Sequence, residues 1–141
     1  MNTLGTVKTT VVTKEESYAI AHSFTSNEAL TKGTPVKLRT DGKIEKCGAA
    51  TDKPIGIVVS GCKAANSIVT VQTEFAAIMN ASADAALTTG DLVSATGVDG
   101  NDVAKFKKSV ATNYICGVAL NAAADTEGVE VGILRTSYLL S

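Results

Sequence analysis

The sequence predicts an all-β protein, or a β-rich one with at most one short helix, arranged as a sandwich or barrel built from two related β units. Three observations support this fold class. Apolar residues come in short runs, turn-forming residues separate the runs, and one series of landmarks occurs twice in the same order. Because only 4% of the residues are aromatic and none is Trp, we expect a core of Val, Ile, Leu and Ala.

The strands are expected where short apolar runs alternate with Gly, Asp, Asn and Pro. An Asp-Gly pair at 41–42 lies between two such runs, and Asp-Gly-Asn at 99–101 has the same place later. Glycine tolerates positive φ, so both predict hairpin turns. An earlier alternating segment spans 7–14, and the later runs are 36–38, 55–59, 68–71, 92–93, 115–120 and 129–134.

The segment 75–87 carries two competing signals. It contains apolar residues at helical spacing, and Ala is the best helix former. The preceding period-two pattern, which runs through Val71, Thr73 and Phe75, instead continues a strand. We expect a strand through about Met79, followed by a loop or a single helical turn.

An internal duplication organises the rest of the chain. Each copy contains a Leu-Thr-x-Gly turn, an Asp-Gly hairpin, a strand that follows a glycine and a Val-x-Val strand. The offsets are 87 − 30 = 57, 99 − 41 = 58, 117 − 56 = 61 and 129 − 69 = 60 residues. We expect units at about 30–78 and 87–135 in a domain spanning 29–141, preceded by an arm or edge-strand segment at 1–28. Gly56 and Gly117 predict a bulge or a close backbone approach.

The two ends of the chain are the candidates for partner contact. An alternating apolar segment at 6–24 can add to a neighbour's sheet edge, or it can form an edge strand of its own domain. The C-terminal tail at 135–141, which contains three consecutive apolar residues, is either a core strand or an interface anchor. The candidate contacts are Val7, Val11, Tyr18, Ile20, Phe24, Tyr138, Leu139 and Leu140.

Composition and motifs disfavour several classes of function. The net charge is −1 and no basic stripe dominates, so we expect no nucleic-acid partner. No apolar run approaches the roughly 18 residues of a membrane span, and the N-terminus lacks a signal-peptide core, which predicts a soluble protein. The three cysteines are widely spaced without a CxxC pair, and neither a calcium loop nor a phosphate-binding glycine motif occurs. We therefore expect neither a metal nor a cofactor.

Two further features have a structural interpretation. His22 is the only histidine, and it shares a period-two row with Tyr18, Ile20 and Phe24, so we expect it to pack or to form a hydrogen bond. A dyad of His22 with a cysteine has no supporting signature, and we expect no enzymatic activity. The lysines at 105, 107 and 108 are expected on a solvated strand or loop face, the alternative being a contact to an acidic partner.

The duplicated body resembles the decoration (cement, or auxiliary head) proteins of tailed-phage capsids. The resemblance covers about 30–135. The family pattern is aGtpV-L-dGkv…a…piGva, then a-G-xVtV, then l-aGdlV. The matching runs are LTKGTPVKLRTDGKIEKCGAATDKPIGIVV, SIVTVQTEF, LTTGDLVSATGVDG and YICGVALNAAADTEGVEVGIL.

The resemblance implies a small β-rich protein that binds the outer face of an assembled head and reinforces it, often as a trimer. It implies the major capsid protein and copies of the same chain as partners, assembly in the host cytoplasm, and a place on the virion surface. Three alternatives stay open: another virion subunit such as a tail-tube or head-fibre protein, a carbohydrate- or receptor-binding β-module, and a small hydrolase that uses His22 or a cysteine.

Overall fold

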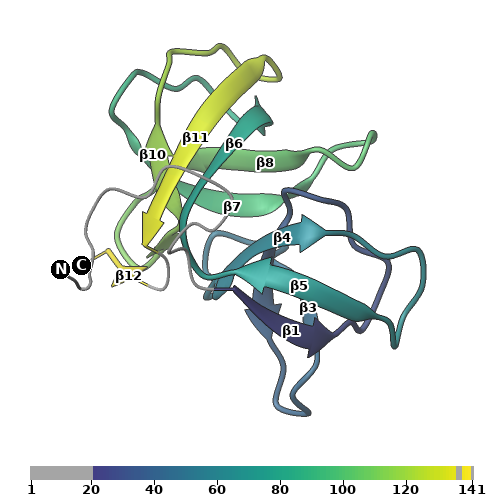
Figure 1. Cartoon of the computed structure of the whole chain (residues 1–141). Helices are drawn as coiled ribbons and strands as arrows, with labels where there is room; N and C mark the ends of the chain where they lie inside the picture. Colours follow the sequence, from purple (N-terminus) through teal and green to yellow (C-terminus); the bar gives the residue numbers. More distant parts are fainter. Residues whose placement is uncertain (1–20, 136–137, 141) are drawn as a thin grey trace, which may run out of the picture.

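The computed structural model describes residues 21–135 and 138–140, and it builds them from strands, turns and loops (Figure 1). These residues include no helix, and hence none long and apolar enough to cross a membrane. The predicted all-β class is confirmed. The strands are β1 (Ala21–Thr25), β2 (Pro35–Leu38), β3 (Ile44–Lys46), β4 (Gly56–Ser60), β5 (Ile68–Gln72), β6 (Glu74–Ala83), β7 (Leu92–Val98), β8 (Ala104–Lys108), β9 (Tyr114–Ile115), β10 (Gly117–Ala119), β11 (Gly128–Arg135) and β12 (Tyr138–Leu139).

The strands form two bodies that lie beside each other (Figure 1). In the structure, the first unit spans 21–72 and is a five-stranded sheet in the order β1-β5-β4-β2-β3. The second unit spans 74–135 and contains a closed barrel in the order β10-β11-β6-β8-β7. β9 and β12 form a separate two-stranded sheet. The strands of the barrel pair antiparallel, except that β6 and β8 run parallel where the barrel closes.

The two units share one strand order. The order β1-β5-β4-β2-β3 in the first unit corresponds to β6-β11-β10-β7-β8 in the second. The parallel pair β6–β8 closes the second unit, whereas in the first unit Ser26, the residue after β1, forms one isolated parallel bridge to Ile44 in β3. The first unit is therefore the same barrel with an open seam.

Equivalent turns repeat the same backbone hydrogen bonds. Gly33 and Gly90 end the two Leu-Thr-x-Gly turns with φ angles of +89° and +91°, which glycine adopts without steric cost. The repeated bonds run from Leu30 N–H to Cys62 O (3.0 Å) and Leu87 N–H to Ala123 O (2.8 Å), and from Gly33 N–H to Val58 O and Gly90 N–H to Ala119 O (both 2.8 Å).

Gly56 and Gly117 lie where two backbones approach closely, as the sequence predicts. A Cβ on Gly56 would collide with the carbonyl oxygen of Gln72, and one on Gly117 with the carbonyl oxygen of Gly132. A side chain at either position would force adjacent strands apart, so glycine lets β4 and β10 pack against their neighbours.

Each unit has its own apolar core, made mainly of Val, Ile, Leu and Ala. The first core consists of Leu30, Val36, Ile44, Val58, Val69 and Val71. The second surrounds the fully buried Phe106, and it also includes Cys47 and Ile57 from the first unit. The peptide N–H of Tyr114 donates to Ala50 O at 2.9 Å across the same boundary. Apolar packing and a backbone hydrogen bond therefore join the units.

The expectation for 75–87 is correct for its first part and wrong for its second. β6 continues through Ala83, four residues beyond Met79, instead of turning into a loop or a helical turn. A register shift against β11 leaves Ile78 opposite Val131 and Ala81 opposite Val129, so the buried apolar residues of β6 include those at 78, 81 and 83. A β-bulge thus produces the spacing of three that resembles a helical pattern.

The described part of the N-terminal segment belongs to the first unit. β1 pairs antiparallel with β5 along its whole length, from Ala21 opposite Gln72 to Thr25 opposite Ile68. The strand expected at 7–14 lies outside the described residues. The proposed division at residue 28 stays a prediction.

Candidate interaction sites

The predicted N-terminal contacts fall on both sides of residue 20. Val7, Val11, Tyr18 and Ile20 lie outside the described residues. Phe24 is half-buried and packs against the first core, with an edge-on ring contact to His22 at a centroid distance of 6.4 Å. Part of this ring therefore serves the protein's own core.

The predicted C-terminal contacts are tied to the loop around β9. Tyr138 pairs with Ile115 and Leu139 pairs with Tyr114. Leu140 is half-buried, and its N–H donates to Asn113 O at 2.8 Å. Leu139 is 55% exposed. The tail thus forms a short strand with Leu139 exposed on the surface.

The side chains considered for catalysis are not brought together. His22 is exposed on the edge strand β1, whereas Cys47 and Cys116 are buried in the second core. Burial raises the pKa of the Cys116 thiol to about 12 and also raises the pKa of Cys47. Cys62 is half-buried, with its Sγ 3.4 Å from both Ser26 Oγ and Glu28 O. Among the described residues, no three His, Cys, Asp or Glu side chains are placed to hold a metal ion.

Two of the three clustered lysines, Lys105 and Lys107, lie on the outer face of β8, and Lys108 ends the strand. Phe106 points into the barrel and is fully buried, while Lys105 and Lys107 are half-buried on the other side. The Lys108 Nζ lies 3.9 Å from Asp91 Oδ1. The predicted placement on a strand face is correct for Lys105 and Lys107, and the alternative of a contact to an acidic partner stays a prediction.

An apolar row crosses the outside of the second barrel. Leu92 pairs with Val118, and Val118 pairs with Gly132. Leu120 packs over Gly132, and Leu92 and Leu120 are 45% and 49% exposed. Sequence reasoning missed this row, because an apolar run predicts a strand without showing which of its residues are exposed.

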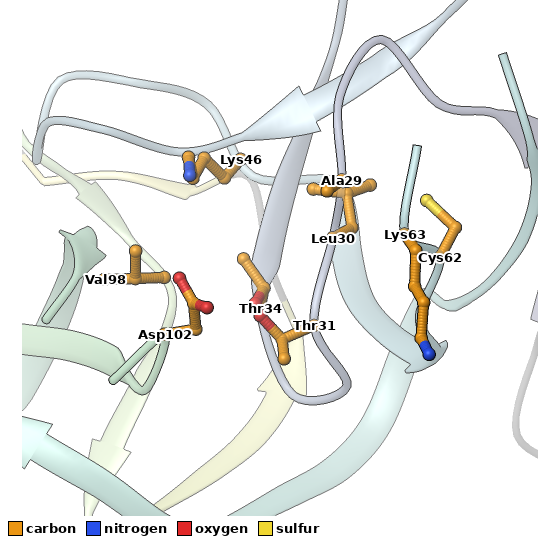
Figure 2. Close-up of a pocket in the computed structure, with 9 residues that line it drawn as sticks. All are labelled: Ala29, Leu30, Thr31, Thr34, Lys46, Cys62, Lys63, Val98 and Asp102. Atoms are coloured by element: carbon orange, nitrogen blue, oxygen red, sulfur yellow. The ribbon is translucent and has the colours of Figure 1, made fainter. Parts of the chain in front are cut away.

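A cavity of about 380 Å³ lies between the first unit and the loop after β7 (Figure 2). Val98 and Asp102 line it from the second unit, and Figure 2 shows the Asp102 side chain entering the same space as Thr34. The main lining residues from the first unit are Leu30, Thr31, Thr34, Lys46, Cys62 and Lys63.

Thr34 has an unusual position in this cavity wall. The residue is 2% exposed, and its hydroxyl oxygen is buried without a hydrogen-bond partner in the described chain. Such a group costs about 1–3 kcal/mol unless something satisfies it. Lys63 and Asp102 are exposed, and neither side chain forms a hydrogen bond or ion pair with another described residue. Sequence reasoning did not single out any of the three.

These features define a two-unit β-barrel protein with a polar cavity at the junction of its units. No protein-family model and no curated protein matches the chain. Among solved structures, the chain is similar to the head fiber gp8.5 N base in bacteriophage phi29. The similarity has a TM-score of 0.51 at 13% sequence identity and covers 84% of this chain and 96% of that chain. At this level of identity it establishes a shared fold.

Proposed function

We propose that this protein is a structural component of a phage virion, and that it binds the outer surface of the assembled head and stabilises it. The observation that carries the proposal is the similarity, over 84% of the chain, to the base of a head fiber. The exposed apolar row on the second barrel and the exposed Leu139 provide contact surface of the kind that such binding needs. The partners in this proposal are the major capsid protein and further copies of the chain, with a trimer as the assembly.

Binding of this kind stabilises a shell by mass action. A ligand that binds only the assembled state adds RT ln(1 + [L]/Kd), which is roughly 4 kcal/mol when its concentration is 1,000 times Kd. Repetition over symmetric sites multiplies the effect. A stable β body with little chemistry of its own is sufficient for this role.

The test uses heads of the protein's own phage from which this protein has been removed. Purified protein should bind these heads saturably and raise the temperature at which they break open, and it should not bind unassembled capsid protein. A reconstruction of the reloaded particles should show surface knobs that are missing from the stripped ones. Unchanged density together with unchanged heat resistance would reject the proposal.

A second candidate is the base of a head fibre, which the same structural similarity favours equally. A decoration protein covers the shell by itself, whereas a fibre base carries a projecting partner. The reconstruction of complete particles separates the two, because only the fibre role predicts elongated density rising from the position of this chain.

A further inference from the structure

The internal duplication provides a direct comparison for the cavity between the units. Thr34 in the first unit and Asp91 in the second each follow the glycine of a Leu-Thr-x-Gly turn. Their backbones form the same turn, with Thr34 N–H donating to Thr31 O at 3.2 Å and Asp91 N–H donating to Thr88 O at 3.1 Å. The two turns therefore differ mainly in their side chains.

In the second unit, a carboxylate fills the turn. Thr88 N–H donates to Asp91 Oδ2 at 2.9 Å, and this bond is the main reason why the pKa of Asp91 lies below its usual value. Lys108 Nζ, 3.9 Å from Asp91 Oδ1, adds a second favourable contact. A backbone N–H, the Thr88 side chain and an ammonium group thus hold one carboxylate.

In the first unit, the same place has donors but no carboxylate. The threonine Oγ1 lies one bond closer to the backbone than an aspartate Oδ, and in Thr34 it has no partner. The N–H of Thr31 likewise donates to no acceptor within the described chain. The turn is therefore built to receive an acceptor that its own sequence does not supply.

Two lysines line the same cavity, and Figure 2 shows their ammonium groups on opposite sides of Thr34. Lys46 corresponds to Lys108, because Lys46 pairs with Val36 as Lys108 pairs with Val93. Its Nζ is 3.8 Å from Glu28 Oε1, a long and half-exposed ion pair that leaves donor capacity. Lys63 adds a second ammonium group without a partner among the described residues. A hydroxyl, a backbone N–H and two ammonium groups are the partners that a carboxylate binds best.

We propose that the cavity between the units is a carboxylate-binding site that receives an Asp or Glu side chain of a protein partner. The incoming carboxylate takes the position that Asp91 holds in the second unit, next to the N–H of Thr31. The Thr34 hydroxyl reaches it by turning about χ1, a change between staggered rotamers. The protein nature of the partner rests on the proposed function, whereas the carboxylate chemistry does not.

Asp102 is the internal competitor of such a ligand. Its side chain lines the same cavity, and its charge repels an incoming carboxylate. The residue has a φ of +61° in an exposed hairpin turn, and its carboxylate has no partner among the described residues. Removing this charge should therefore tighten binding. If Asp102 instead fills the site itself, its removal should release the N–H of Thr31.

The test is an NMR titration of the full chain with N-acetyl-aspartate amide, with N-acetyl-asparagine amide as the uncharged control. We expect a saturable downfield shift of the Thr31 amide proton with the aspartate compound alone. Thr34→Val should weaken binding at least about tenfold, because a hydrogen bond to a charged group is lost. Thr34→Ser should bind normally, and Asp102→Asn should bind more tightly.

Thr34→Asp is the most informative variant, because it copies the second unit into the first. Its own carboxylate should shift the Thr31 amide proton without any ligand and abolish the response to the aspartate compound. No shift in the unmodified protein, or an equal shift with the asparagine compound, would overturn the proposal. So would a Thr31 amide proton that is already shifted without ligand and moves back in Asp102→Asn. Should Thr34→Asp fail to fold, the Ser, Val and Asn variants still decide.

Binding to phage heads separates this inference from the proposed function. Thr34→Asp should bind stripped heads more weakly than Thr34→Ser if the partner's carboxylate enters this cavity. Equal binding by the two variants would overturn the assignment of the partner. If the unmodified protein binds the aspartate compound but does not bind heads, the proposed function is wrong and the carboxylate site is still supported.

Discussion

Replacing Gly117 by alanine tests the close packing that both units share. A Cβ at this position would collide with Gly132 O, and it would lie 2.8 Å from Ile133 Cδ1 and 2.9 Å from Val131 Cγ1. Overpacking of a buried site typically costs about 1–3 kcal/mol, and a backbone carbonyl in a closed barrel has little room to move. Alanine regains about 0.4–1 kcal/mol by restricting the unfolded chain. We therefore expect Gly117→Ala to lower the free energy of unfolding by about 2 kcal/mol.

Gly128→Ala is the matched control, because it lies in the same barrel and its Cβ would meet no atom within 4 Å. Urea unfolding followed by circular dichroism measures both variants. With slopes of about 1–3 kcal/mol/M, the midpoint of Gly117→Ala should fall by about 1 M, while that of Gly128→Ala should change little. Equal midpoints for the two variants would refute the argument that this approach requires glycine.

Three further predictions concern the core, the turn of the second unit and the thiols. Phe106→Ala should lower the free energy of unfolding by about 3–5 kcal/mol in the same urea assay, because the ring is fully buried. The backbone hydrogen bond from Thr88 lowers the pKa of Asp91. Its stabilising effect should therefore be complete above the ordinary Asp pKa of about 3.9 and disappear as the pH falls through the lower folded value; acid unfolding of Asp91→Asn should lack this dependence. In a thiol titration of the native protein, Cys62 should react first, and the two buried cysteines should react only after denaturation.

Local signals were enough to predict the fold class. The Asp-Gly turn at 41–42 and the equivalent turn near 99 both form hairpins, β2–β3 and β7–β8. The repeated Leu-Thr-x-Gly turns show the same positive φ at Gly33 and Gly90. These features depend on residues close together in the chain, and for that reason the sequence alone reveals them.

Long-range pairing was not predictable in the same way. Nothing local shows that β6 begins the second unit and pairs with β11, about 50 residues later in the chain. The register shift in that pair changes the spacing of the residues that β6 turns into the core, and this spacing resembles a helical pattern. The cavity could not be predicted from the sequence for a similar reason. The loop that carries Asp102 comes near Thr34 only because one unit packs against the other.

The two copies differ in how far one apolar face is exposed. Pro35 and Ile57 of the first unit are buried, and Ile57 belongs to the second core. Their counterparts in the second unit, Leu92 and Val118, form part of the exposed apolar row. The first unit buries this face and the second unit exposes it. The exposed copy is therefore a surface of the kind that packs against apolar residues. Because only the first of these faces is buried within the chain, substitutions on the second should change the free energy of unfolding little, and we expect them to weaken the proposed binding to heads more.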